Sequence, residues 1–355
     1  MAVLASQAPI FYAENGCAEL SNYLRASKPS MIFVLVDSNT HNNCLNIFLQ
    51  QLETTITIEV IEMEAGEEHK NIETCSGIWE TLSELGADRK SLLINLGGGV
   101  VTDLGGFVAS TFKRGIPYMN VPTSLLAMVD ASVGGKCGVD LGNLKNQIGV
   151  INQPEMVLID SNYLSTLPAN EMRSGLAEIL KHGLIANEAY WEKATNLEAL
   201  TLEDLDSLII ESIEIKSRIV QEDPTEKSVR KTLNYGHTLG HAIESYFLTN
   251  PNKITLLHGE AVAAGMIMAT HLSYKICGFP EKKLENITNK INELFPKINL
   301  LEEDYEMVLD LLKFDKKNSH GNINFVLLKD IGKAELDVIV PNDQLIEAMN
   351  YYLKN

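Results

Sequence analysis

Short apolar runs alternate with helical patterns through the first half of the chain, and this alternation constrains the fold more than any other feature. We predict strands over residues 31–36, 55–62, 91–96 and 118–121. A helix is predicted over residues 70–85, ended by Gly86, and another follows residues 122–124. Strands that alternate with helices of this length are typical of βαβ units. The pattern therefore predicts an α/β domain with a parallel sheet.

From about residue 168 long amphipathic helical patterns replace the strands. We predict helices over residues 171–185, 202–222, 238–247, 260–277 and 343–353, with a hairpin formed by NINFVLL and AELDVIV. At about 150 residues per domain, a chain of 355 residues suggests two domains. We place them at residues 1–167 and 168–355. Small-molecule sites often lie at domain boundaries, so a cleft between the two domains is the expected place for a site.

Composition excludes several classes of function. The chain has 29 Lys and Arg against 47 Asp and Glu, a formal charge of −18, which disfavours binding to nucleic acid or to an anionic membrane. We see no apolar run of about 18 residues and no basic N-terminal start, so neither a transmembrane helix nor a signal peptide is expected. The five cysteines form no C-x-x-C pair. Scattered cysteines of this kind indicate reduced thiols and a cytoplasmic protein.

A glycine-rich segment, LGGGVVTDLGGFVAS, occupies residues 96–110 between a predicted strand and a helix. Without Cβ atoms, Gly97, Gly98 and Gly99 let the backbone approach a pyrophosphate at the positive end of the helix. The spacing differs from the usual dinucleotide fingerprint, because Thr102 stands where its third glycine would be. A tight strand-to-helix turn is the alternative interpretation, although the segment favours phosphate binding.

Four histidines fall within one short region: His237, His241, His258 and His271. The i,i+4 spacing of His237 and His241 suits a divalent metal, and pattern alone leaves them equal as candidates. His258 precedes a helix, while Glu178 lies on an earlier helix. Two histidines with one carboxylate are typical of a catalytic zinc site with an open position. His271, inside an apolar helix, is better explained by packing.

Several cations stand out in this acidic chain. Taken singly, each is best explained as a solvated surface residue. Together they suit a small substrate that carries a phosphate and a carboxylate. The cations are Lys136, Lys145, Lys181, Lys216, Arg230, Lys316 and Lys317.

The order of seven motifs resembles the 3-dehydroquinate synthase family, over residues 37 to about 328. The motifs are GGGVVTDLGGFVASTFKRGI, VPTSLLAMVDASVGGKCGVD, LKNQIGVINQP, GLAEILKHGLI, KTLNYGHTLGHAIE, LLHGEAVAAGM and DKKNSHG. The resemblance implies an N-terminal Rossmann-like parallel-sheet domain and a mainly α-helical C-terminal domain, with the active site in the cleft. It also implies a homodimer.

The reaction implied by the resemblance is the conversion of 3-deoxy-D-arabino-heptulosonate 7-phosphate to 3-dehydroquinate and phosphate, in the shikimate pathway. The C5 hydroxyl is transiently oxidised by NAD, phosphate is eliminated, and C5 is reduced again. The ring then opens and an intramolecular aldol step closes the carbocycle. NAD and Zn²⁺ are the implied cofactors, and Co²⁺ suits the same ligands.

Residue roles follow from the same motifs. Glu178, His237 and His258 match the family's zinc ligands, whereas His241 matches a position that handles substrate and protons. Arg114 matches a phosphate-binding arginine that reaches across the dimer. Positions that match substrate-binding residues are Lys136, Asn146, Lys181, Lys216, Arg230, Asn234 and one of Lys316 and Lys317. Positions assigned to NAD are Asp37, Asn39, Glu67, Lys70, Gly97, Gly98, Gly99, Val100, Asp103, Thr123, Ser124, Asp130, Lys136 and Lys145.

The chain departs from the family's motifs at a few positions. Cys137 and Asp140 replace the usual Thr and Asn, Ser124 replaces a Thr, and the spacing from His237 to His258 is long. Three alternative functions stay open at this point. They are a cyclase acting on a neutral sugar phosphate, a metal-dependent polyol dehydrogenase, and a binding protein without activity. The cations Lys136, Lys216 and Arg230 favour an anionic sugar acid.

Overall fold

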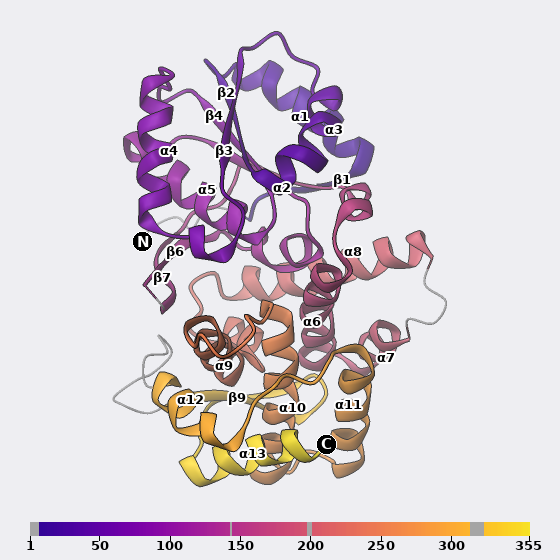
Figure 1. The fold of residues 1–355 in the computed structure, drawn as a ribbon. Coiled ribbons are helices and arrows are strands. Elements are labelled where there is room, and N and C mark those ends of the chain that lie inside the picture. The colour runs from indigo at the N-terminus through magenta and orange to yellow at the C-terminus, as the bar shows by residue number, and fades with distance from the viewer. Residues whose placement is uncertain (1–6, 143, 197–200, 313–322) are drawn as a thin grey trace. The chain divides into compact units, whose positions relative to one another are not determined.

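The chain forms two compact units in a computed structural model that describes residues 7–142, 144–196, 201–312 and 323–355. The units are Met1–Pro168 and Ala169–Asn355 (Figure 1). Among the described residues, every helix is too short or too polar to cross a bilayer. Lys316 and Lys317, one of which is predicted to contact substrate, lie outside the described residues.

A six-stranded parallel sheet forms the centre of the first unit, in the order β1-β8-β5-β4-β2-β3. Its strands are β1 (Ile10–Tyr12), β2 (Ile32–Asp37), β3 (Ile58–Met63), β4 (Leu92–Gly97), β5 (Tyr118–Pro122) and β8 (Val157–Ile159). The predicted parallel sheet is therefore confirmed. From β2 the chain goes outward to β3, then returns to β4 on the other side of β2. Ligands of such sheets bind beyond the carboxyl ends of the strands at this change of direction.

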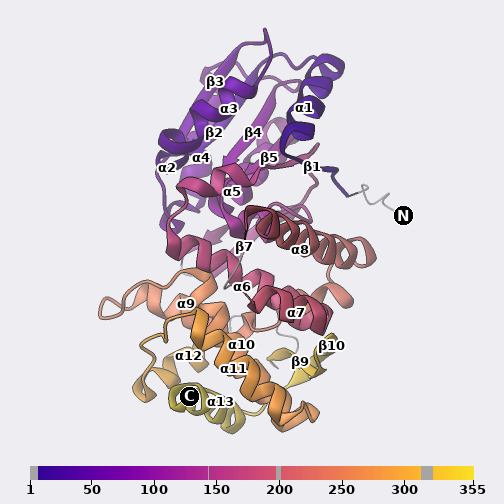
Figure 2. The same cartoon turned by 90° about the vertical axis from the view of Figure 1, so that its right-hand side faces the viewer.

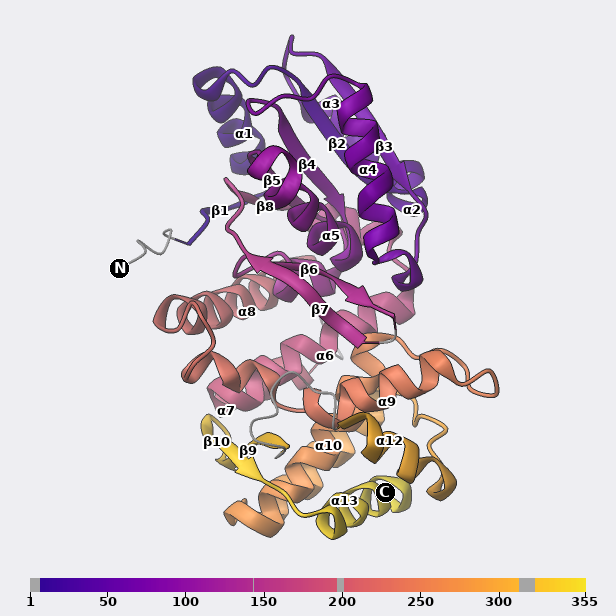
Figure 3. The same cartoon turned by 90° about the vertical axis from the view of Figure 1, so that its left-hand side faces the viewer.

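Helices cover both faces of this sheet. The helices are α1 (Ala13–Ser27), α2 (Ser38–Thr40), α3 (Asn46–Gln51), α4 (Ile72–Glu84) and α5 (Gly99–Thr111). The pair α4 and α5 lies in front of the sheet in Figure 3 and shares a core with Phe33 and Leu35 of β2. The helix predicted over residues 70–85 starts at Ile72 because the Asn71 side chain accepts from the Thr74 amide. It ends before Gly86, whose φ is 80°.

An antiparallel hairpin, which the sequence analysis did not predict, packs on α5. It consists of β6 (Lys136–Leu141) and β7 (Leu144–Ile151). A Cβ on Gly106 of α5 would lie 2.4 Å from the Cys137 sulfur and 3.1 Å from the Cys137 Cβ, so any larger residue would push the Cys137 side chain away. The Tyr118 hydroxyl donates to the Asn152 carbonyl and fixes the end of the hairpin to the sheet.

The second unit is mainly helical (Figure 2). Its helices are α6 (Ala169–Ala186), α7 (Glu188–Thr195), α8 (Leu202–Glu222), α9 (His237–Thr249), α10 (His258–Cys277), α11 (Glu281–Leu294), α12 (Tyr305–Leu312) and α13 (Asn342–Lys354). The predicted hairpin is present as β9 (Asn324–Asp330) and β10 (Lys333–Ile339). Most of α10 is buried, because α6, α9, α11 and α13 all pack against it.

Short 3₁₀ and π segments complete the described chain. The 3₁₀ segments are η2 (Glu67–His69), η3 (Phe112–Arg114), η5 (Ser161–Thr166), η6 (Val229–Asn234) and η7 (Glu302–Asp304). The π segments are η1 (His41–Leu45) and η4 (Ala127–Ala131). The helix predicted after residues 122–124 is only a short stretch that contains η4. Its last turn is closed by the Ser132 amide, which donates to the carbonyl of Ala127.

Candidate functional site

Three helices of the second unit bring Glu178, His237 and His258 together. Glycines at the helix contacts explain why these helices lie so close. A Cβ on Gly259, in the first turn of α10, would lie 2.1 Å from the Ser174 carbonyl oxygen of α6. A Cβ on Gly265 would lie 2.0 Å from the Gly236 carbonyl oxygen, beside the start of α9. The first turns of α9 and α10 are thus held against each other and α6.

Two ligand-atom distances within this trio suit a tetrahedral metal ion. Oε1 of Glu178 lies 3.3 Å from Nε2 of His237 and 3.6 Å from Nε2 of His258. Ligands at ~2.1 Å from a tetrahedral zinc are about 3.4 Å apart. Oε1 of Glu178 is also buried without a hydrogen bond. A buried acceptor in that state is costly, and a cation placed between the three ligand atoms would satisfy it.

His241 belongs to the same cluster. It lies one turn after His237 on α9, and their ring centroids are 5.1 Å apart. The ring centroid of His258 is 5.6 Å from that of His241. Ligand atoms of the three histidines all lie within 4.8 Å of one another. The geometry therefore brings His241 next to the candidate metal site, within reach of a group bound there.

Charge in the cluster is set by its neighbours. Burial raises the pKa of the Glu178 carboxyl, but Lys181 and His237 outweigh burial and hold that pKa well below its usual range. Nζ of Lys181 forms an ion pair with Glu178 inside the unit. Burial lowers the pKa of His258, yet Glu244 and Glu178 outweigh it and raise the pKa to about 10. A divalent cation would take the place of that proton, because only neutral imidazole is a ligand.

Buried cations are a second feature of this unit. The side chains of Lys181, Lys216 and Arg230 are each at most 6% exposed, which is rare for these residue types. The loop before Arg230 is held by Asp223, whose carboxylate accepts from the backbone amides of residues 227, 228 and 230. Those hydrogen bonds outweigh burial and lower the pKa of Asp223 to about 2. Asn234, at the end of η6, donates to Glu226. Burial therefore contradicts a solvated surface role for Lys181, Lys216 and Arg230, whereas Lys136 is exposed.

In the first unit a polar cluster joins the β6–β7 hairpin to α5 and η2. Nζ of Lys70 lies 2.6 Å from Oδ2 of Asp103 and 2.8 Å from Oδ1 of Asn146. Nζ of Lys145 lies 2.5 Å from Oε1 of Glu67. Burial lowers the pKa of Lys70, but Asp103 and Glu67 outweigh it and raise that pKa above its ordinary value. Five residues that the motifs assign to NAD or substrate thus contact one another.

Replacing Lys70 with Met is expected to destabilise the first unit by about 3 kcal/mol, since a buried ion pair loses one partner. Chemical denaturation measures this loss. The exposed Lys90, replaced in the same way, should change stability by no more than about 0.5 kcal/mol. Adding Asp103→Leu to the Lys70 variant should restore part of the stability. A further loss in the double variant would contradict the pairing.

The carboxyl edge of the sheet gathers the other predicted cofactor residues. Asp37, Gly97 and Pro122 end the neighbouring strands β2, β4 and β5. Gly98 caps α5 without any side-chain hydrogen bond, and the Thr123 amide donates to Gly97. Val100 lies in the first turn of α5, and Ser124 accepts from the amide of Ala127. First-turn amides of α5 therefore point outward at the sheet's switch in strand order, as phosphate binding requires.

The positions of the remaining predicted residues give less information about ligand binding. Asp37 caps α2 through Thr40, and Asn39 lies in the same short helix. Asp130 belongs to η4, and Lys136 begins β6. Arg114 is exposed at the end of η3, with a φ of 68° that follows the 48° of Lys113. Consecutive left-handed residues are strained, and such strain collects at functional sites.

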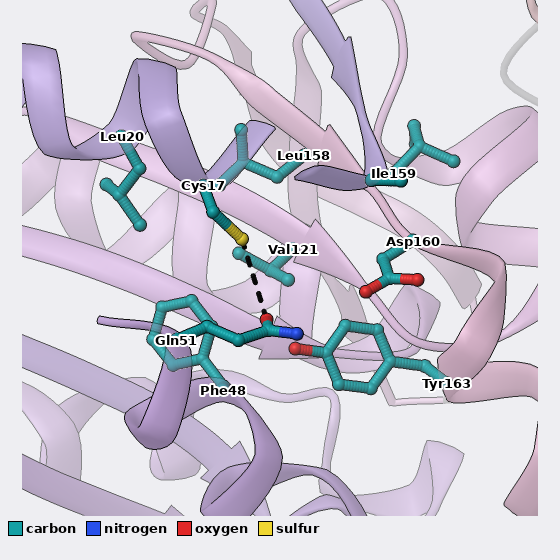
Figure 4. Close-up of a pocket in the computed structure, with 10 residues that line it drawn as sticks. Cys17, Leu20, Phe48, Gln51, Val121, Leu158, Ile159, Asp160 and Tyr163 are labelled. Atoms are coloured by element: carbon teal, nitrogen blue, oxygen red, sulfur yellow. Dashed lines mark hydrogen bonds between the residues drawn. The ribbon is translucent and has the colours of Figure 1, made fainter. Parts of the chain in front are cut away.

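A small cavity in the first unit is unrelated to these groups (Figure 4). Its volume is about 20 Å³, and it is lined by Cys17 of α1, Phe48 of α3, Val121 of β5, Leu158 of β8 and Tyr163 of η5. Val121 points to the face opposite Tyr118 and Asn120, because side chains alternate along a strand. One water fills such a volume, so no cofactor fits there.

Two contacts were missed at the sequence level. Asp140 accepts from the Asn146 amide, and Glu244 lies 3.2 Å from Nδ1 of His258. The helix spacing offered a signal for the second contact, because Glu244 follows His237 and His241 at i+7 and i+3. No spacing signal points to the first, since it depends on a hairpin that was not predicted.

Solved structures are known that combine a parallel-sheet unit with a helical unit. The fold resembles that of 2-epi-5-epi-valiolone synthase from Streptomyces hygroscopicus, solved with NAD⁺ and Zn²⁺, with a TM-score of 0.83 at 23% identity over 100% of this chain and 99% of that one. It also resembles 2-deoxy-scyllo-inosose synthase, solved with carbaglucose-6-phosphate, NAD⁺ and Co²⁺, with a TM-score of 0.82 at 24% identity, covering 98% and 99% of the chains. At such identity these likenesses show the fold alone.

Sequence comparison goes further. Residues 60–174 match the 3-dehydroquinate synthase N-terminal family, and residues 175–318 match the 3-dehydroquinate synthase C-terminal family. A 3-dehydroquinate synthase of Parabacteroides distasonis is 41% identical over 337 residues, which cover 94% of this chain and 95% of the relative. The chain belongs to the 3-dehydroquinate synthase family. The resemblance found in the seven motifs is thereby confirmed, and so is an enzyme of the lyase type.

Proposed function

We propose that this chain converts 3-deoxy-D-arabino-heptulosonate 7-phosphate to 3-dehydroquinate and phosphate, with NAD and a zinc ion as cofactors. The observation that carries the proposal is the trio of Glu178, His237 and His258, with the buried cations Lys181, Lys216 and Arg230 in the same unit. Family membership fixes the class of reaction, and the trio supplies its metal ligands. When bound, zinc would polarise the C5 oxygen and NAD would accept and return a hydride.

Each unit has its own task in this proposal. The first unit holds NAD, with the diphosphate at the first-turn amides of α5 and the polar cluster around Lys70 shaping the site. The second unit holds zinc and the anionic substrate. Lys181, Lys216 and Arg230 bind carboxylate or phosphate oxygens, and a buried cation does so strongly because little water competes. His241 lies close enough to the metal ligands to accept or donate a proton at the substrate.

The relatives' cofactors agree with this assignment, since the two cyclases of similar fold were solved with NAD⁺ and with Zn²⁺ or Co²⁺. The cytoplasm and a homodimer, in which Arg114 reaches the partner's substrate, are part of the same proposal. We also propose domain limits of 1–167 and 168–355.

The decisive assay measures phosphate released from the heptulosonate phosphate with catalytic NAD and added zinc. Release that requires both cofactors, stops with a chelator and leaves no net NADH is the expected result. Faster release from sedoheptulose 7-phosphate would instead indicate a cyclase for neutral sugars. Stoichiometric NADH formed from glycerol would indicate a polyol dehydrogenase.

Replacing Arg230 with Met is expected to raise the KM for substrate about 30- to 100-fold while NAD affinity stays within about twofold, because one charge-assisted anchor is lost. Steady-state kinetics and NAD titration measure the two effects. Lys231, the next residue, is only partly buried, at 31% side-chain exposure, and is paired with Asp337, so Lys231→Met is the matched control with near-normal kinetics. Equal losses for substrate and NAD in the Arg230 variant would contradict this role.

A further inference from the structure

Glu244 contacts one of the candidate metal ligands from the side away from the other two. It belongs to α9 and is 7% exposed, so little water reaches its carboxylate. Oε2 of Glu244 lies 3.2 Å from Nδ1 of His258, whereas Nε2 of His258 is directed to Glu178. The imidazole ring of His258 therefore stands between the carboxylate of Glu244 and the place of the metal.

The helix geometry explains how Glu244 reaches this position. His237, His241 and Glu244 follow one another at i, i+4 and i+7, so they share one face of α9. That face packs on the first turn of α10, where His258 is the first residue. Gly240, on α9 between the two histidines, allows the approach, since a Cβ there would lie 3.1 Å from the Ala261 carbonyl oxygen.

His237 has a similar partner, which supports a common design. Its Nδ1 lies 3.1 Å from the carbonyl oxygen of Tyr235, and its Nε2 faces Glu178. Both rings thus present Nε2 to one point and Nδ1 to an acceptor. A metal-bound histidine is typically fixed in this way, with the second ring nitrogen donating to a carboxylate or carbonyl.

We propose that Glu244 is a positioning residue for the metal centre. Its carboxylate accepts the Nδ1 hydrogen of His258, fixes the tautomer and ring orientation that direct Nε2 to the metal, and makes His258 a stronger ligand. Glu244 is not itself a ligand, because the ring of His258 separates it from the shared point. This inference rests on the proposed metal site.

The test is the zinc dissociation constant of the intact protein, measured by competition with a chromophoric chelator. Glu244→Leu removes the acceptor, and Glu244→Gln keeps an acceptor oxygen but loses its charge. We expect zinc to bind about 10- to 100-fold more weakly in the Leu variant, with an intermediate loss in the Gln variant. Visible absorption of the Co²⁺-loaded protein is expected to shift in the Leu variant, because the His258 ring is no longer held in place.

The matched control is Glu347→Gln. Glu347 also faces a histidine, His271, at 3.9 Å, but outside the candidate metal cluster. Its zinc affinity should equal that of the wild type. Thermal unfolding of the zinc-free proteins separates positioning from folding, since a merely structural role would lower that melting temperature and leave the zinc affinity unchanged. If the Leu variant does not fold, the Gln variant alone decides.

Two results would overturn the proposal in distinguishable ways. In the first, the wild type binds zinc, and the folded Leu and Gln variants bind it with dissociation constants within twofold of the wild-type value. That result would refute the role of Glu244 alone. Wild-type protein that binds no zinc would refute the metal site itself, and the role of Glu244 with it.

Discussion

Glu178→Gln is expected to abolish catalysis and to weaken zinc binding by roughly 100-fold or more. A structural zinc ion contributes about 3 kcal/mol per ligand, and an amide oxygen replaces a carboxylate poorly. The same change removes a counter-charge from Lys181, which is fully buried. Breaking a buried pair in this way costs about 3–5 kcal/mol. Metal analysis measures the first loss, and chemical denaturation of the zinc-free variant against the zinc-free wild type measures the second.

The control for this prediction is an exposed pair in the same unit. Glu211 lies 2.8 Å from Lys193, and both side chains are about 40% exposed. Glu211→Gln should therefore cost less than about 1 kcal/mol and leave zinc content and activity unchanged. Wild-type zinc affinity in the Glu178 variant would refute Glu178 as a ligand, while unchanged stability would refute the importance of its pair with Lys181.

Gly259→Ala is expected to have a comparable effect without removing any functional group. The added Cβ would lie 2.1 Å from the carbonyl oxygen and 2.4 Å from the Cα of Ser174. Both are main-chain atoms, so no change of side-chain rotamer relieves the clash. The first turn of α10 must then move away from α6 and carry His258 with it. We expect a loss of stability of about 3 kcal/mol or more, together with loss of zinc. Calorimetry and metal analysis measure both.

Two controls separate this clash from milder effects. Gly77 lies on the exposed side of α4, and a Cβ added there would have nothing within 4 Å, so Gly77→Ala should stabilise the protein by about 0.5–1 kcal/mol. Ser174→Ala removes only the hydrogen bond from the Gly259 amide to the Ser174 hydroxyl, at about 1 kcal/mol. Normal zinc content in Gly259→Ala would show that α6 and α10 can separate without disturbing the ligands.

The sequence predicts the regular parts of this fold well because burial is periodic there. Strands β2, β4 and β5 are almost fully buried and mainly apolar, as is typical of parallel strands covered on both faces. Helix α8 follows its predicted range of 202–222 because Thr201 and Asp204 form a capping box at its start. Strand β3 starts at Ile58 rather than residue 55, since the alternating pattern alone does not show where pairing with β2 begins.

The hairpin of β6 and β7 could not be predicted in the same way. Its burial depends on one side packing against α5, and the close contact between Gly106 and Cys137 joins residues that no local pattern relates. The contacts of Lys70 with Asp103 and Asn146 have the same origin, because three separate segments supply them. Motif resemblance could name these residues, but it could not tell that they contact one another.

Spacing alone left His237 and His241 as equal candidates for the metal. The structure adds a carboxylate oxygen of Glu178 that is shared by His237 and His258, which no helix periodicity could reveal across three helices. It also places Lys216 and Arg230 inside the protein, where composition favoured the surface for each cation taken singly. Burial of a charge is thus the information that the sequence lacks most.

An ion held by Glu178, His237 and His258 would cross-link three helices, α6, α9 and α10, and so close the long loops between them. Such a reversible cross-link stabilises the folded state, because the unfolded chain cannot bring the three ligands together. Its contribution to folding grows with the logarithm of the free ion concentration. The supply of the ion would then set how much of the protein stays folded, as well as how fast each folded molecule works. Scarcity of the metal would therefore reduce the amount of this enzyme through turnover of its unfolded form.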